Sequence, residues 1–372
     1  MNFLLLTYEY PPFHGGVATY LGNLMKAAPE SVSLEVEVIP KGEHWIKSTI
    51  NQLYKVKSRH TDLFAISHVL PVGYVAWIQK LFTGTPYIVF THGTDILSAK
   101  KSAWKRFWMR FVLRRARLVI ANSRFTAGLL KEEGINRAEI VPPSIVVFEK
   151  LDTISRSNWN SKRIISIGRL VERKGFDTGI KALSIVRKEF PDVTYTIIGN
   201  GPYLETLEKI VANDGLQANV HILTKIDDQE KLKELDKASI FILPARAAGA
   251  DIEGFGIVTL EASAAGLPVV VGRSGGAPEG VIDGVTGIVI EPNDPKSLAD
   301  AISRLFSNPG EARKMGEEGR KYVNDEYAIE KFAKRFWDLI AMSSSRAQRG
   351  ISKSQEGSEI PRPGQIDHTD SE

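Results

Sequence analysis

The sequence has no cysteine among its 372 residues, and this absence excludes a disulfide framework, a thiolate zinc site and cysteine nucleophilic catalysis. Long apolar runs are also missing, since the longest, residues 69–78, is about half of what a membrane-spanning helix requires. The short apolar segment 3–6 lacks the basic leader of a signal peptide. We therefore expect a cytoplasmic protein that does not span a bilayer and holds no metal.

The sequence has little net charge, since its 48 Lys and Arg residues and 44 Asp and Glu residues give a net charge of +4. This balance argues against a nucleic-acid-binding protein with a positive field over its whole surface. The charge is nevertheless unevenly divided. Residues 1–150 hold 19 basic and 11 acidic side chains, whereas residues 151–372 hold 29 and 33. We therefore expect any anionic surface to meet the first half of the chain.

Short β-branched and aliphatic runs alternate with segments of helical periodicity, a pattern that indicates βα units feeding parallel sheets. The strands expected in the first half are 3–6, 34–39, 62–66, 87–90, 118–121 and 139–141. Those expected in the second half are 164–167, 194–198, 220–223, 240–243, 269–271 and 288–290. The sequence therefore predicts an α/β fold of two tandem Rossmann-like, doubly wound domains that face a cleft at the carboxyl ends of their strands.

A polar linker over residues 155–162 separates the two halves. We predict an N-terminal domain over residues 1–155 and a C-terminal domain over residues 156–342. The last helix of the second domain has an apolar stripe and could return to the first domain. Residues 343–372 are rich in Ser, Pro, Gly and Gln with almost nothing to bury, so a disordered tail is expected there.

The clearest chemical signal lies in residues 251–266, where a loop at a strand end runs into a helix. Glu261 is the only charge between Gly256 and Gly266. A helix that is apolar all round is buried, and a carboxylate on it needs strong donors such as sugar or ribose hydroxyls. Gly254 and Gly256 would let backbone amides approach a diphosphate closely. The alternative is that Glu261 is a satisfied core acid and Glu253 a solvated loop residue.

A second glycine-flanked loop, residues 168–175, carries three cations directly after an expected strand. Two of them, Arg169 and Lys174, could grip a diphosphate, the arginine as a planar fork and the lysine as a point charge. The alternative is a solvated basic surface. Two further Gly-rich loops, residues 199–201 and 274–279, are expected at the same edge.

In the first half, Gly15 and Gly16 lie between the first expected strand and a helix. Because glycine has no side chain, an anion could approach the backbone N–H groups at the start of this helix as well. The segment is not G-x-G-x-x-G, which weakens a dinucleotide-binding interpretation. His92 follows another strand beside Gly93, where it could bond a substrate or serve a structural role.

Taken together, these motifs resemble a family 4 retaining glycosyltransferase of the GT-B fold. The resemblance rests on the Glu253-x7-Glu261 pair, the cationic loop, the Gly-Gly loop after the first strand, the His92 segment and the Gly-Gly-Ala-Pro-Glu loop, and it covers about residues 1–340. It implies that the C-terminal domain, residues 156–342, binds a nucleotide-sugar donor. It also implies that the N-terminal domain, residues 1–155, binds a glycan or lipid-linked acceptor, and that no cofactor is used.

The resemblance also implies roles for individual residues. Arg169 and Lys174 would bind the donor diphosphate, and Glu261 would bind the ribose. Glu253 would hold hydroxyls of the transferred sugar, with His92 beside that sugar on the acceptor side. The remaining residues expected to bind substrate, partly through backbone groups, are Gly15, Gly16, Gly199, Ile226, Phe255, Gly256 and Ile257.

Within the family, residues 244–254 and 274–279 are most similar to the mannosyltransferases that decorate phosphatidylinositol and use GDP-mannose. One departure is that Pro142-Pro143-Ser144-Ile145 stands where the family has Pro-Asn-Gly or Pro-Pro-Gly followed by an aspartate. This departure puts the geometry near the interdomain linker in doubt.

Two other functions stay open at this point. A nucleotide-sugar epimerase on the same fold would consume donor with no acceptor present. An inactive sugar-nucleotide or lipid-binding module would bind donor without consuming it.

A basic helix is expected between Asp95 and Glu132, a stretch with ten Lys and Arg and no acid. An apolar stripe recurs at helical spacing on it, made of Trp104, Phe107, Trp108, Phe111 and Val112. We predict Arg106, Arg110, Arg114 and Arg117 on the opposite face. One interpretation is a stripe that faces the core. The other is a helix resting on the inner surface of an anionic membrane, with Trp104, Trp108, Arg106, Arg110 and Arg114 as the membrane-facing residues.

Overall fold

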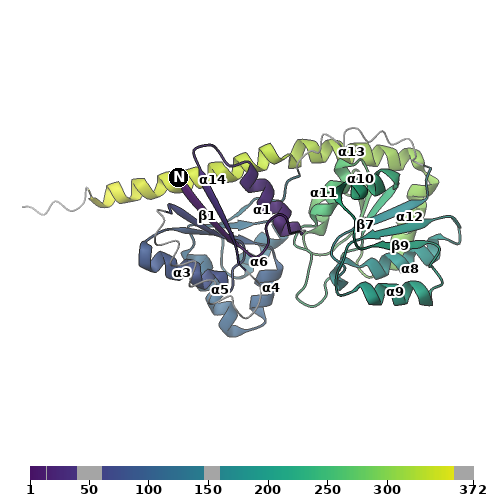
Figure 1. Cartoon of the computed structure of the whole chain (residues 1–372), viewed down its shortest axis with the longest axis horizontal. Helices are drawn as coiled ribbons and strands as arrows, with labels where there is room; N and C mark the ends of the chain where they lie inside the picture. The colour runs from purple at the N-terminus through teal and green to yellow at the C-terminus, as the bar shows by residue number, and fades with distance from the viewer. Residues whose placement is uncertain (14, 40–60, 146–159, 356–372) are drawn as a thin grey trace, which may run out of the picture.

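The structure is a computed structural model that describes residues 1–13, 15–39, 61–145 and 160–355. Its residues form two α/β domains side by side (Figure 1). The predicted linker 155–162 lies mostly outside the described residues.

The N-terminal domain holds a six-stranded sheet in the order β2-β1-β3-β4-β5-β6, and every neighbouring pair is parallel. Its strands are β1 (Asn2–Thr7), β2 (Ser33–Val38), β3 (Leu63–Ile66), β4 (Tyr87–Thr91), β5 (Leu118–Ala121) and β6 (Ala138–Ile140). The helices described between them are α1 (Gly16–Lys26), α3 (Val72–Thr83), α4 (Thr94–Lys100), α5 (Ala103–Arg115) and α6 (Arg124–Glu132).

The C-terminal domain repeats this architecture with a second parallel sheet, in the order β12-β11-β10-β7-β8-β9. Its strands are β7 (Arg163–Ile167), β8 (Thr194–Ile198), β9 (Val220–Leu223), β10 (Ile240–Leu243), β11 (Val269–Gly272) and β12 (Gly287–Ile290). Its helices are the short η1 (Glu172–Lys174) and η2 (Ala277–Gly280), then α8 (Phe176–Val186), α9 (Leu204–Asn213), α10 (Asp228–Lys237), α11 (Ile257–Ala264), α12 (Pro295–Ser307), α13 (Pro309–Tyr327) and α14 (Ile329–Gln355). The predicted fold class is confirmed.

Each sheet is buried on both faces because successive residues of a strand point to opposite sides. In β1, Leu4 and Leu6 join one apolar cluster of the N-terminal domain, and Phe3 and Leu5 join the other. This double burial explains why most strands are nearly continuous apolar runs in the sequence, whereas the edge strand β2 alternates glutamate with apolar residues.

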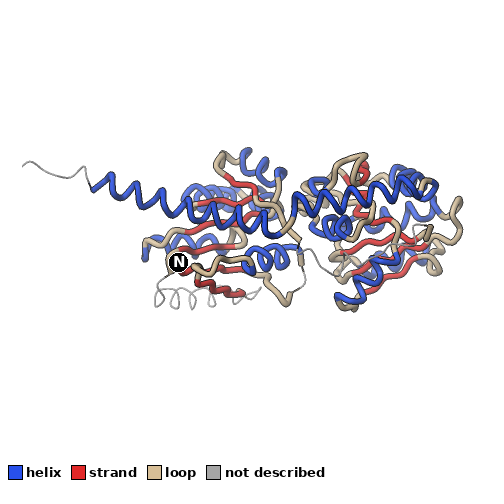
Figure 2. Tube along the Cα trace, turned by 90° about the horizontal axis from the view of Figure 1, so that it is seen from above, coloured by secondary structure: helices blue, strands red, loops and turns tan. Residues whose placement is uncertain are grey.

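Helix α14 leaves the C-terminal domain and packs along the N-terminal one (Figures 1 and 2). Phe336 and Trp337 join the cluster of Phe3 and Leu5, and the indole Nε1 of Trp337 donates a hydrogen bond to the carbonyl of Leu24 at 3.1 Å. The prediction of disorder from residue 343 is wrong as far as Gln355, because α14 continues to that residue. Once a helix is anchored by packing, extending it carries no nucleation cost, so polar residues can follow. Residues 356–372 lie outside the described part.

Helix α5 differs from its predicted arrangement. The residues buried against the domain are Met109, Val112 and Leu113, so the stripe predicted from Trp104 to Val112 is split between two faces. Trp104 and Phe107 are 65% and 57% exposed. The core-facing interpretation is therefore wrong for these two side chains. Arg117 lies beyond the end of α5 and is not on its basic face.

Trp108 links α5 to α3. Its ring lies 5.2 Å from that of Tyr74 and 5.7 Å from that of Trp77, measured between ring centroids. Among the helices of the described residues, none combines the length and the apolar character needed to cross a membrane.

Candidate active site

A buried ion pair stands at the carboxyl end of the C-terminal sheet. The ammonium of Lys174 lies 2.8 Å from Glu253 Oε2, and the two side chains are 8% and 11% exposed. Lys174 is the last residue of η1, and η1 follows the loop after β7. The next residue, Gly175, has φ of 69°, and a Cβ there would lie 1.9 Å from the carbonyl oxygen of Pro244, so only glycine fits. The structure thus brings two predicted site residues into contact.

Arg173 and Asp251 complete this group, although sequence reasoning gave neither a role. Arg173 Nε lies 3.5 Å from Glu253 Oε2, and Arg173 Nη1 donates to both oxygens of Asp251 at 3.2 and 3.0 Å. Burial alone would raise the pKa of Glu253, but the charges of Lys174 and Arg173 outweigh it and hold that pKa below its usual range. Glu253 is therefore ionised at neutral pH.

The fourth charged residue of the prediction, Glu261, lies on α11 and faces α10 instead. Its Oε2 is 3.6 Å from Lys231 Nζ, and the Glu261 side chain is 17% exposed. Burial lowers the pKa of Lys231, but Glu261 and Asp228 raise it more, so the net shift is upward. Lys231 was missed because nothing in the local sequence links it to a residue thirty positions away.

Arg169 is exposed in the loop after β7, and no ion pair of the described residues involves it. Gly168 and Gly199 shape that loop, because a Cβ on Gly199 would lie 1.9 Å from the carbonyl oxygen of Gly168. Phe255 is 2% exposed with its ring against Tyr327, and Ile226 packs against the core. The side chains of Phe255 and Ile226 therefore contribute to the packing of the fold.

Two helix N-termini meet beside these charges. Helix α11 begins after Gly256, whose φ of 83° is in the left-handed region, and α1 begins after Gly15. Among the described residues, no side chain caps the first turn of either helix with a hydrogen bond. A Cβ on Gly16 would lie 3.6 Å from Ile257 Cγ2, so the two N-termini are neighbours across the domain boundary. Free backbone N–H groups and the positive ends of two helix dipoles favour an anion here.

His92 approaches the same boundary from the N-terminal domain. A Cβ on Gly254 would lie 2.2 Å from the His92 carbonyl oxygen, and the Thr94 hydroxyl donates to the carbonyl of Ile252 at 3.1 Å. His92 Nε2 lies 2.9 Å from the carbonyl oxygen of Ser67. Because a carbonyl only accepts, Nε2 carries the proton and Nδ1 is left as an acceptor. Burial lowers the pKa of His92, so the ring is neutral at pH 7.

Glu279 joins the two domains directly, and sequence reasoning placed it only in a Gly-rich loop. Its carboxylate oxygens accept from the backbone N–H groups of Arg124 and Phe125 at 2.8 and 2.7 Å, at the N-terminus of α6. The backbone carbonyl of Glu279 accepts from the Tyr327 hydroxyl at 2.9 Å. Glu279 thus connects the loop 274–279 to both the N-terminal domain and the end of α13.

The departure from the family pattern lies at the crossing between domains. Ser144 is buried, and its carbonyl accepts from the Asn23 side chain at 2.9 Å. The N–H of Ile145 donates to the carbonyl of Tyr327 at 3.2 Å. These bonds pack the segment firmly without the glycine that the family usually has there.

Two doubly wound domains with cations, carboxylates and open helix N-termini at their junction define the GT-B class of glycosyltransferases. The family model for "Glycosyl transferases group 1" matches residues 147–322, and that for "Glycosyltransferase Family 4" matches residues 30–147. The chain belongs to this glycosyltransferase family, as the resemblance in the sequence indicated. Within the described residues, no cluster of three or more His, Asp or Glu side chains is arranged to hold a metal ion.

Individual relatives cover almost the whole chain. A GDP-mannose-dependent alpha-(1-6)-phosphatidylinositol monomannoside mannosyltransferase of Mycolicibacterium smegmatis is 41% identical over 91% of this chain and 98% of its own length. A GDP-mannose-dependent monoacylated alpha-(1-6)-phosphatidylinositol monomannoside mannosyltransferase of Corynebacterium glutamicum is 28% identical over 91% of this chain and 97% of its own length.

Solved structures share the fold at low identity. Anabaena HepE in complex with UDP and glucose has a TM-score of 0.76 at 19% identity, covering 92% of this chain and 100% of that one. Sucrose-phosphate synthase of Thermosynechococcus elongatus has a TM-score of 0.77 at 20% identity, covering 93% and 99%.

Proposed function

We propose that the protein transfers mannose from GDP-mannose to a hydroxyl of a phosphatidylinositol mannoside-type lipid, with retention of anomeric configuration. The observation that carries this proposal is the 41% identity to a mannosyltransferase of that specificity over 98% of its length. The Lys174–Glu253 pair beside two open helix N-termini supports it.

The donor diphosphate lies against the N-terminus of α11, with Lys174 and Arg169 as its cations. When the bond from the anomeric carbon to the diphosphate breaks, negative charge grows on the departing phosphate. Cations already positioned there stabilise the transition state more than the ground state. Lys174 is held for this role by Glu253.

Glu253 accepts hydrogen bonds from hydroxyls of the transferred mannose, and Nδ1 of His92 accepts one from the acceptor side. Glu261 takes the ribose hydroxyls. The acceptor oxygen bonds to the anomeric carbon on the face that GDP leaves, and the departing phosphate takes the acceptor proton. No protein general base is needed in this scheme.

The test is incubation of the purified protein with GDP-mannose, UDP-glucose or UDP-N-acetylglucosamine, each with and without a phosphatidylinositol mannoside extract. We expect a mannosylated lipid only with GDP-mannose and lipid together. Donor consumed to an isomer without lipid would indicate an epimerase. Donor bound but never consumed would indicate a binding module.

Contact with the inner face of a membrane is part of the proposal, because the acceptor is a lipid. It is supported by four exposed apolar side chains of α3 and α5: Leu81, Phe82, Trp104 and Phe107, which are 66%, 78%, 65% and 57% exposed. We expect binding to anionic vesicles that weakens with added salt. Cosedimentation equal to that with neutral vesicles would defeat the idea.

A further inference from the structure

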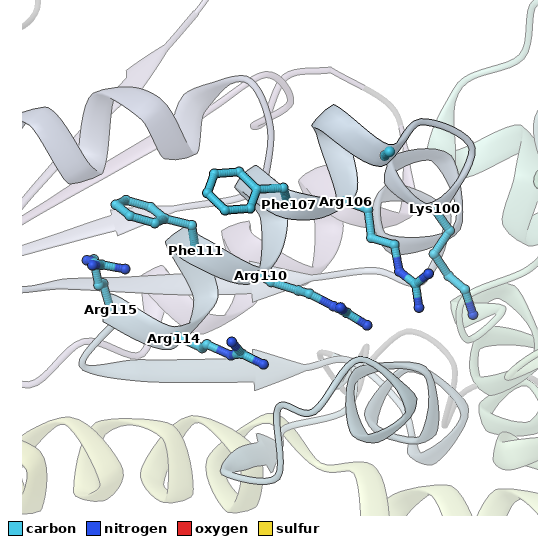
Figure 3. Close-up of a pocket in the computed structure, with 8 residues that line it drawn as sticks. Lys100, Arg106, Phe107, Arg110, Phe111, Arg114 and Arg115 are labelled. Atoms are coloured by element: carbon cyan, nitrogen blue, oxygen red, sulfur yellow. The ribbon is translucent and has the colours of Figure 1, made fainter.

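A groove of about 460 Å³ runs along α5 and is lined by residues of the N-terminal domain. Five cations line it, namely Lys100, Arg106, Arg110, Arg114 and Arg115. Arg106, Arg110 and Arg114 project from α5 in one direction at i, i+4 spacing, and Phe107 and Phe111 project in another (Figure 3). The groove therefore has a cationic row beside an aromatic row.

A single buried carboxylate organises the cationic row. Glu133 is 1% exposed, and its oxygens lie 2.8 Å from Nε of both Arg106 and Arg110 and 3.7 Å from the ammonium of Lys100. Burial would raise the pKa of Glu133, but the two arginines hold it below its usual range, so the carboxylate stays ionised. Glu133 fixes the two guanidinium groups while they remain 43% and 35% exposed.

The positive charge of the groove exceeds what Glu133 neutralises. Glu132 adds a second carboxylate, 2.9 Å from Lys100. Five cations against two carboxylates leave three positive charges. Neither Arg114 nor Arg115 forms an ion pair with a carboxylate of the described residues, and Arg115 instead stacks on Phe111 at 3.6 Å from the ring centroid. An excess of fixed, exposed arginines is complementary to a phosphate group, which guanidinium groups can grip through paired N–H donors.

We propose that this groove binds the phosphodiester of an anionic phospholipid at the membrane surface, with Glu133 holding Arg106 and Arg110 in position. A lipid fits better than a soluble phosphate because exposed Phe107 forms the rim of the groove and Trp104 stands beside it on α5. Such side chains enter the interfacial region of a bilayer, while neighbouring arginines meet its phosphates. This inference rests on the proposed function for its membrane partner, but it concerns a surface separate from the donor site.

The test compares three variants with wild-type protein in vesicle flotation. R110Q/R114Q removes two groove charges, and F107S removes an aromatic side chain. The control R304Q/R313Q removes two exposed arginines of the C-terminal domain, each of which pairs with a glutamate. The vesicles are pure phosphatidylcholine or phosphatidylcholine with phosphatidylinositol. Soluble glycerophosphoinositol and a single-stranded oligonucleotide are added as competitors.

We expect R110Q/R114Q to lose about thirtyfold in affinity for the phosphatidylinositol vesicles and R304Q/R313Q to lose almost none. F107S should lose binding to both kinds of vesicle. Partial competition by glycerophosphoinositol supports headgroup recognition. Equal loss in the two arginine pairs, or competition by the oligonucleotide as strong as that by glycerophosphoinositol, would overturn the proposal.

Folding and the proposed function are checked separately. Each variant's Tm and its affinity for GDP-mannose are measured without lipid. If wild-type protein binds the phosphatidylinositol vesicles through the groove but consumes no GDP-mannose, the proposed function fails and the lipid site stands.

Discussion

Two buried carboxylates, Glu253 and Glu133, organise charge in opposite ways. Glu253 keeps Lys174 inside the molecule, where the ammonium is 8% exposed and balanced. Glu133 keeps Arg106 and Arg110 at the surface, where positive charge is in excess. In the account proposed above, the buried ion pair positions a cation for catalysis at the domain junction, and the surface ion pairs position cations for binding a phospholipid. The exposure of the cation and the local charge balance distinguish the two uses.

The largest effect is expected from K174A. It removes the buried cation of the junction, so turnover should fall on the order of a hundredfold or more, because a preorganised charge at the leaving group is lost. In K174A, Glu253 still has Arg173 as a cationic neighbour. The Tm of the variant is measured so that a loss of folding can be distinguished from a loss of catalysis. The matched control is K209A, whose exposed lysine pairs with Glu205. Near-normal turnover in a folded K174A protein would remove Lys174 from the mechanism.

A smaller effect is expected from E279Q, which tests a carboxylate that joins domains. The substitution removes the negative charge at the N-terminus of α6 and one of the two acceptor oxygens, so the observed contact between the domains should be less stable. Turnover should fall about tenfold, with a larger radius of gyration in small-angle scattering. E291Q alters an exposed surface pair in the same domain and should change neither quantity. An unchanged radius and rate in E279Q would mean that Glu279 does not hold the domains together.

The smallest effect concerns stability against pH and compares the two carboxylates directly. The pKa values of Glu253 and Glu133 are both lowered below the ordinary 4.5. Near pH 4 the unfolded chain therefore binds more protons than the folded one, so the ion pairs stabilise the fold above pH 4.5 and lose this contribution as the pH falls. The Tm advantage of wild type over E253Q and over E133Q should shrink by a few degrees between pH 7 and pH 4. If the Tm difference between wild type and a variant does not depend on pH, the pKa of the replaced carboxylate is not lowered in the folded protein.

The sequence predicts the sheets well and the site only in part. Each of the twelve described strands lies within two residues of its expected position, because most of them are short runs of β-branched and aliphatic residues. The Arg173–Asp251 contact joins residues 78 positions apart, and the Phe125–Glu279 contact joins residues 154 apart. No local pattern carries such pairings. For α5, helical spacing alone predicts a single apolar face. In the structure, Val112 is buried against the domain, Trp108 packs on α3, and Trp104 and Phe107 are exposed.

A structure of the protein with bound GDP tests the central claim most directly. We predict diphosphate oxygens within hydrogen-bonding distance of Lys174 Nζ and of the first backbone N–H groups of α11, with the ribose hydroxyls on Glu261. A diphosphate bound elsewhere, with the Lys174–Glu253 pair untouched by the ligand, would contradict the account.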